Sequence, residues 1–147
     1  MANETPSGRS VQCVVVTPER AVLDETADFV AIPMFDGELG VLPGRAPLIG
    51  RLGYGELRIR SGSHTQRYFI DGGFAQVRGN VVTVLTPRAQ KAEEIDVAAV
   101  TRQLEKSRGT AATGAALESS LKGQERARAQ LLVARHVQGG DDTQHSG

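Results

Sequence analysis

The sequence changes character near residue 90, and this change constrains the fold more than any other feature. All six prolines lie at or before Pro87, and all six aromatic residues lie at or before Phe74. Beyond residue 90 the chain is rich in Ala, Leu, Glu, Gln, Lys and Arg. Proline and glycine mark turns, whereas alanine and unbranched side chains favour helix. We therefore expect a β-rich part at 10–88 and a helical part at 89–138, with flexible ends at 1–9 and 139–147.

The β-rich part shows short strand segments that are separated by turns. Residues 10–17 are rich in β-branched side chains, and Leu57 and Ile59 alternate with charged residues. The segments 71–73 (DGG) and 78–80 (RGN) each predict a turn, the first of them a hairpin between two strands. Parallel strands need long crossovers, usually helical, for which this part has no room. The pattern predicts an antiparallel β-sandwich or barrel.

The helical part predicts two helices. Asp96 is expected to cap the first, which ends at Gly109, and a flexible connector at 109–114 leads to the second, at 115–137. The apolar stripe of the first helix consists of Val97, Val100 and Leu104. The stripe of the second consists of Leu117, Leu121, Ala127, Leu131 and Ala134. Gly123 costs this helix about 1 kcal/mol relative to alanine, so its state should depend on what it packs against.

Several classes of function are excluded by composition and spacing. The 17 basic residues balance the 17 acidic ones, whereas nucleic-acid binders usually carry a basic surplus. Cys13 is the single cysteine, which rules out an internal disulfide and permits a reducing compartment, and the three histidines form no metal-ligand spacing. We interpret Gly50, Gly53 and Gly55 as turn glycines, because they do not match a dinucleotide-binding loop. No nucleophile and base stand in a pattern typical of a hydrolase.

Interaction with other proteins is the function that remains, and residues 35–48 are the most individual stretch of the chain. They hold three glycines and two prolines, with Asp36 and Glu38 on an apparent turn. By residue chemistry alone, the interpretation of this stretch as an ordinary acidic turn beside a core strand stays open. A free-standing sandwich that binds a sugar or peptide is the alternative function. A solvent-exposed platform of Tyr54 and Tyr68 would favour it.

Residues 37–48, GELGVLPGRAPL, resemble a block of the epsilon subunit of F-type ATP synthases, which typically reads G-E-L-G-x-x-P-G-H-A-P-L. Arg45 stands where that family has histidine, so a weak base is replaced by a permanent cation. Further matches follow in order between about residues 11 and 106, and they fall at 15–20, 55–59, 72–77, 81–86 and 92–96.

The resemblance implies an N-terminal β-sandwich of about ten strands, a C-terminal two-helix hairpin and a non-catalytic subunit of the central stalk. The implied partners are the gamma subunit, the c-subunit ring and the catalytic beta and alpha subunits. Membrane association would come only through this complex, at the cytoplasmic face of a bacterial cell membrane, with a plastid thylakoid as the alternative. By residue match, the contacts with the c ring fall on Asp36, Gly37 and Glu38, and the wider rotor interface includes Leu42 and Arg45.

The same resemblance implies that the hairpin regulates ATP hydrolysis by rising into the catalytic head. The basic residues expected to contact an acidic docking surface there are Lys122, Arg126, Arg128 and Arg135. Some bacterial members bind ATP through a motif [IL]-D-x-x-R-A, but Ala99 stands here in place of its arginine. A degenerate site would be left with Asp96 and Arg102. We therefore expect no cofactor and no regulatory ATP, and we read Asp96 as a helix cap first.

Overall fold

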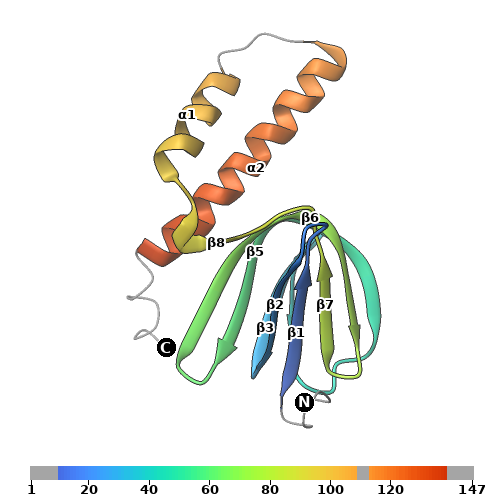
Figure 1. The fold of residues 1–147 in the computed structure, drawn as a ribbon. Coiled ribbons are helices and arrows are strands. Elements are labelled where there is room, and N and C mark those ends of the chain that lie inside the picture. Colours follow the sequence, from blue (N-terminus) through green and yellow to red (C-terminus); the bar gives the residue numbers. More distant parts are fainter. Residues whose placement is uncertain (1–9, 109–112, 139–147) are drawn as a thin grey trace.

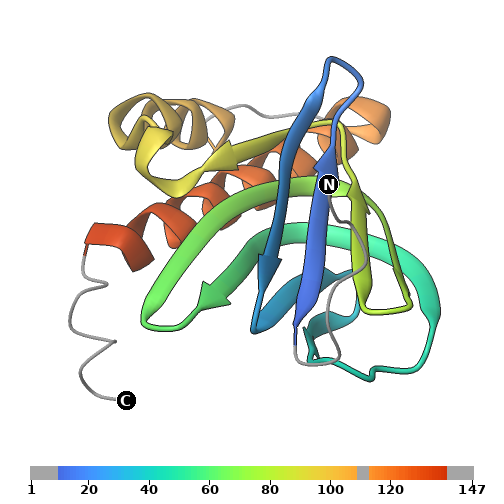
Figure 2. The same cartoon turned by 60° about the horizontal axis from the view of Figure 1, so that its bottom comes forward.

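The computed structural model describes residues 10–108 and 113–138. The strands form a sandwich, a long helix packs against strands β5 and β6, and a second, shorter helix lies beside the long one (Figures 1 and 2). The flexible ends predicted at 1–9 and 139–147, and most of the predicted connector, lie outside the described residues.

Eight strands within the described residues form one sheet in the order β2-β1-β7-β6-β5-β3-β4, with β8 paired to β6. The strands are β1 (Val11–Val16), β2 (Ala21–Ala27), β3 (Phe29–Met34), β4 (Gly37–Val41), β5 (Leu48–Ser61), β6 (His64–Arg78), β7 (Val81–Leu85) and β8 (Ala89–Lys91). The expected sandwich is confirmed, with eight strands against about ten expected. β5 and β6 are long and curve strongly (Figure 2), so that β6 pairs with β8 through one half and with β7 through the other.

One pair departs from the predicted antiparallel order, because β1 and β7 run parallel. The other strand pairs are antiparallel. The prediction assumed that parallel neighbours require a crossover helix. Here the intervening strands β2 to β6 make the connection, and no helix is needed.

The prediction of a hairpin at residues 71–73 is wrong, since β6 continues through these residues. Gly72 and Gly73 do have left-handed backbone, with φ of 76° and 112°. That freedom bends the strand instead of ending it, and a Cβ on Gly73 would overlap the carbonyl oxygen of Leu85. The turn predicted at 78–80 is confirmed, since Gly79 and Asn80 link β6 to β7 with positive φ.

The three glycines expected in turns lie inside β5 instead. A Cβ added at Gly50 would lie 2.7 Å from Met34 Cε, and one added at Gly55 would lie 2.8 Å from Pro33 Cβ. Glycine in a strand often marks the close approach of another segment. At these positions it lets β5 pass close to the end of β3.

The sandwich encloses one apolar core that draws residues from both of its layers. Cys13 is fully buried in this core, as expected for a packed thiol, and Tyr68 is 3% exposed. Burial raises the pKa of the Cys13 thiol to about 12, with smaller contributions from Glu25 and Asp24. The largest fully buried members of the core are Ile32, Leu57, Ile59 and Ile70.

The helical part consists of a short 3-10 turn, η1 (Ala92–Glu94), and the helices α1 (Val97–Arg108) and α2 (Gly114–Gln138). The predicted cap of α1 is confirmed, because Asp96 Oδ1 accepts a 3.0 Å hydrogen bond from the Ala99 N–H. Val100 and Leu104 are buried, as their spacing predicts.

The start of the stripe predicted for α2 is wrong, because Leu117 and Leu121 are exposed. The end of α1 meets α2 near Ser120, whose Oγ lies 3.4 Å from the Ser107 carbonyl oxygen. The first turns of α2 therefore extend past α1 (Figure 1) and have no apolar partner there. Ala127 and Ala134 are buried and continue the stripe as predicted.

Candidate functional sites at the helix junction and the acidic turn

One face of strands β5 and β6 points away from the sandwich core and toward α2. Successive strand residues point to opposite faces, so Leu57 and Ile70 fill the core while their neighbours Glu56, Phe69 and Asp71 lie on the outer face. Tyr54 is directly opposite Asp71 in the register and shares that face. This face and the helix surface on it are called the helix junction below.

The centre of the helix junction is apolar and built mainly from small side chains. Phe69 is fully buried there, although it does not belong to the sandwich core. It clusters with residues of η1, α1 and α2, and the buried members are Ala92, Ile95, Val100, Leu104, Ala127, Val133 and Ala134. The three alanines bury little area each, so most of the apolar contribution to docking comes from Phe69 and the few larger aliphatic side chains around it.

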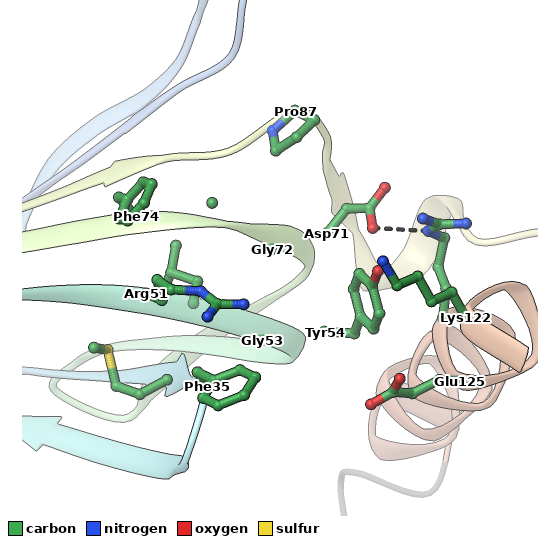
Figure 3. A pocket seen from close by; sticks show the side chains of 14 residues that line it. Phe35, Arg51, Gly53, Tyr54, Asp71, Gly72, Phe74, Pro87, Lys122 and Glu125 are labelled. Atoms are coloured by element: carbon green, nitrogen blue, oxygen red, sulfur yellow. Dashed lines mark hydrogen bonds and ion pairs between the residues drawn. The ribbon is translucent and has the colours of Figure 1, made fainter. Parts of the chain in front are cut away.

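A charged pair lies at one end of the helix junction. Arg126 Nε of α2 donates a 2.8 Å hydrogen bond to Asp71 Oδ1, and the guanidinium lies 5.2 Å from the centroid of the Tyr54 ring (Figure 3). The hydrogen bond to Asp71 raises the pKa of Arg126, while partial burial acts in the opposite direction. The guanidinium therefore remains charged while it holds the helix to β6.

The other end of the helix junction is closed by His136, whose Nδ1 lies 2.6 Å from Glu56 Oε2. Between the two ends, Gln130 Nε2 of α2 donates to Gln90 Oε1 of β8 at 3.0 Å, and Gln130 is buried. Residues 126, 130, 133 and 136 fall on one helical face because they recur at helical spacing. That face is the surface of α2 that meets the sandwich.

Glu56 also belongs to a chain of ion pairs that leads away from the helix. Its Oε2 lies 3.4 Å from Arg67 Nε, and its Oε1 lies 3.6 Å from Arg58 Nη1. The same Arg58 nitrogen lies 2.7 Å from Glu38 Oε2 and donates a hydrogen bond to it. Glu38, predicted as a contact with a partner, is therefore already engaged within the chain.

The acidic turn, residues 35–38, connects β3 to β4 on the surface. Gly37 has a φ of 136°, which suits glycine at such a turn. Asp36 is exposed, and Phe35 is 66% exposed beneath the Arg51 guanidinium, which lies 4.4 Å from its ring centroid. The structure thus places the predicted contacts Asp36, Gly37 and Glu38 together on one accessible turn.

The next turn carries the other two residues that were predicted as rotor contacts. Leu42 is 57% exposed, and its carbonyl oxygen accepts a 3.2 Å hydrogen bond from the Arg45 N–H. The Gly44 N–H donates to Asn80 Oδ1 at 2.7 Å, which ties this turn to the β6–β7 turn. Leu42 and the exposed Arg45 are therefore presented on a braced loop.

The four predicted regulatory cations occupy different environments. Lys122, Arg128 and Arg135 are exposed, and Arg128 Nη2 donates to Gln124 Oε1 of its own helix at 3.2 Å. Arg126 is committed to Asp71 instead. Lys122 and Arg126 also line an open cleft of about 630 Å³ between α2 and the bends of β5 and β6 (Figure 3), beside Phe35, Arg51 and Phe74.

The residues of the degenerate nucleotide site do not form a cradle of their own. Asp96 is used as the cap of α1, and Arg102 is exposed farther along that helix. Among the described residues, no group of three His, Cys, Asp or Glu could hold a metal ion. No helix in the described part of the chain has the length and hydropathy to cross a membrane.

The exposed Tyr54–Tyr68 platform, which would favour a free-standing binding module, is not formed. Tyr68 belongs to the sandwich core, and Tyr54 lies on the opposite face of the sheet, partly covered and close to Arg126.

Sequence reasoning missed the sandwich side of the helix junction, above all Glu56, Phe69 and Asp71. Two of them do have a signal in the sequence. For Glu56 it is the alternation in β5, where polar Glu56 and Arg58 flank core residue Leu57. On β6, three apolar residues in a row, 68–70, signal a strand that is buried on both faces. The partners on α2 are distant in sequence and leave no local trace.

The fold and its two sites define a protein of two parts, a sandwich with exposed contact turns and a helical hairpin docked on one face. The sequence profile described as "ATP synthase, Delta/Epsilon chain, beta-sandwich domain" matches residues 10–92. An ATP synthase epsilon chain of Rhodopirellula baltica is 62% identical over 95 residues, which cover 65% of this chain and 74% of the relative. One of Carboxydothermus hydrogenoformans is 46% identical over 98 residues, which cover 67% and 73%. The chain belongs to the ATP synthase delta/epsilon chain family.

Two solved structures share the fold across both parts. A chain of the Euglena gracilis mitochondrial ATP synthase (OSCP/F1/c-ring) superposes with a TM-score of 0.69 at 23% identity, over 95% of this chain and 89% of that one. A chain of the Tetrahymena thermophila mitochondrial ATP synthase central stalk and c ring gives 0.65 at 17% identity, over 84% and 96%. The helical hairpin is therefore part of the shared architecture.

Proposed function

We propose that this chain is the epsilon-type subunit of the central stalk of a rotary F-type ATP synthase, without an active site of its own. The observation that carries the proposal is the family match over the whole sandwich, residues 10–92, in a chain whose described fold also includes the hairpin. In this role the sandwich links the gamma subunit to the c ring, so that ion-driven rotation reaches the catalytic head. The chain is held peripherally at the cytoplasmic face of a bacterial membrane through the complex alone.

The rotor contacts proposed for the sandwich lie on its two exposed turns. Asp36, Gly37 and Glu38 face polar loops of the c ring, and Leu42 and Arg45 complete the interface with the rotor. A sandwich suits this task because its backbone hydrogen bonds are closed within the sheet, so it transmits torque without shearing. Glu38→Ala is expected to lower coupled ion pumping, whereas a coupling and assembly equal to the wild type would remove this role from Glu38.

The hairpin is proposed to regulate ATP hydrolysis by leaving the helix junction and contacting the catalytic beta and alpha subunits. Lys122, Arg128 and Arg135 are exposed already, whereas Arg126 joins them only after it leaves Asp71. The apolar part of the junction is limited to one cluster around Phe69, and each exposed ion pair contributes only about 0–1 kcal/mol. Two positions of the hairpin within a few kcal/mol of one another are what a switch requires.

The regulatory role is tested by a chain that ends after Lys91, incorporated into the ATP synthase complex. Such a chain keeps the acidic turn and the turn that carries Leu42 and Arg45. The complex should therefore assemble and couple ion flow to ATP synthesis, while its rate of ATP hydrolysis should rise. Hydrolysis equal to that of the full-length complex would contradict the inhibitory role and leave the rotor role standing.

No cofactor is proposed, and regulatory ATP is not expected because Ala99 replaces the arginine of the family motif. Isothermal titration of the isolated chain with ATP tests this expectation directly. Tight binding would show that Asp96 and Arg102, or the cleft beside Lys122, serve a nucleotide after all.

A further inference from the structure

The acidic turn and the docked helix α2 are connected by charged side chains that meet over strand β3. Glu38 of β4 and Arg58 of β5 lie on opposite sides of β3, since Glu38 pairs with Pro33 and Arg58 pairs with Ala31. Their side chains meet over β3 at 2.7 Å. Glu56 is two residues before Arg58 on the same face and holds His136 of α2 at 2.6 Å. Four side chains thus join the acidic turn to the end of the hairpin.

We infer that Glu38 controls the docking of α2 through Arg58 and Glu56. When a cationic group of a partner pairs with Glu38, the docking of the hairpin on the sandwich weakens. One nitrogen of Arg58 is shared unequally, at 2.7 Å from Glu38 and 3.6 Å from Glu56. If Glu38 turns to another cation, Arg58 is free to close on Glu56. The inference rests on the proposed function only for the identity of that cation, a basic side chain of the rotor.

The direction of the effect follows from the charges around Glu56. Arg67 Nε lies 3.4 Å from the same carboxylate, and it is a buried N–H donor without a hydrogen-bond partner in the described structure. With Arg58 drawn in toward Oε1, two guanidinium groups share the negative charge of the one carboxylate whose Oε2 holds His136. A neutral His136 then has a weaker acceptor, and a protonated His136 is repelled by the added positive charge. Docking is weakened in both cases.

The charge of Asp36 provides a matched control on the same turn. Asp36 and Glu38 are two residues apart and both are exposed, but the ion pairs of the network run only through Glu38. Asp36→Asn and Glu38→Gln therefore remove the same charge from the same surface. Only the second change should release Arg58.

Helix docking can be measured through a thiol placed in the helix junction. Val133 is 1% exposed and lies seven residues after Arg126 and three before His136, on the face of α2 that meets the sandwich. A Val133→Cys, Cys13→Ala chain of full length should react with a thiol reagent only while the helix is lifted. The labelling rate then reports the lifted fraction, and circular dichroism checks that each variant remains folded.

Glu38→Gln is expected to raise this labelling rate about two- to fivefold, the range of one exposed ion pair, while Asp36→Asn leaves it unchanged. Arg58→Gln should leave the rate unchanged or lower it, and it should abolish the effect of Glu38→Gln. Equal rates in the Glu38 and Asp36 variants, or an effect of Glu38→Gln that persists without Arg58, would overturn the inference. The isolated chain is used throughout, so a negative result leaves the proposed rotor function untouched.

Discussion

Arg126 of α2 donates a 2.8 Å hydrogen bond to Asp71 of β6, and this pair joins two residues that are 55 positions apart in the chain. Asp71 precedes the two glycines that bend β6, so the bend presents its carboxylate to the helix. The pair therefore lies where the strand bends and α2 crosses it.

Asp71→Asn is expected to weaken helix docking, because it removes the charge that Arg126 faces. Arg126 is partly exposed, so the loss should be about 1 kcal/mol or less. The labelling rate of a cysteine at position 133 would rise accordingly. Arg128→Gln is the control, since Arg128 bonds only within its own helix among the contacts seen here, and it should leave the rate unchanged.

Phe69→Ala is expected to cost about 3–5 kcal/mol of unfolding free energy in the full chain, because Phe69 is fully buried beneath the helices. In a chain that ends after Lys91, the helices that cover Phe69 are gone, and the cost should fall below about 1 kcal/mol. Urea unfolding of both chains measures the difference. An equal cost in the two chains would mean that Phe69 is held by the sandwich and not by the hairpin.

Two glycine substitutions should act in opposite directions. Gly73→Ala should destabilise the fold by at least about 3 kcal/mol, because it combines strained backbone with overlap against Leu85. Gly123→Ala should stabilise it by about 1 kcal/mol, because Gly123 is helical and a Cβ there meets nothing within 4 Å. Urea midpoints of both variants check the pair. A Gly73→Ala protein as stable as the parent would contradict the described bend in β6.

The buried Cys13 thiol should make stability fall at high pH. Burial raises its pKa from 9.0 to about 12, so the folded chain keeps a proton that the unfolded chain releases. The contribution is complete below pH 9 and is lost as pH rises from 9 toward 12, by up to about 1.4 kcal/mol per pH unit. Cys13→Ala should lack this part of the decline. Identical pH profiles of parent and variant, or rapid alkylation of Cys13 in the folded protein, would contradict the burial.

The division of the chain into a sheet and two helices could be predicted from sequence because it rests on local chemistry. Proline, glycine and alanine act on their own backbone, and the Asp96 cap needs only the next turn of helix. Gly72 and Gly73 show the limit of such reasoning. Their sequence signals left-handed backbone correctly, but the same backbone serves a hairpin turn or a bent strand, and pairing with β5 decides between them.

The helix junction could not be predicted because its members are brought together only by the fold. Nothing in the residues near Glu56 shows that His136, 80 positions later, will lie beside it. The apolar spacing of Leu117 and Leu121 is that of a buried stripe, yet α1 does not cover them, and both are exposed. Periodicity reports which side chains are able to share a face, whereas burial depends on what that face meets.

Purification through an affinity tag on this chain, from detergent-extracted membranes of the cells that encode it, tests the rotor assignment most directly. We expect the large ATPase subunits, the gamma subunit and the c ring to elute with it in fixed stoichiometry. An Asp36→Asn, Glu38→Gln chain should carry less c ring in the same experiment. Elution of the wild-type chain alone, with the ATP synthase intact in the flow-through, would contradict the assignment of this chain to the rotor.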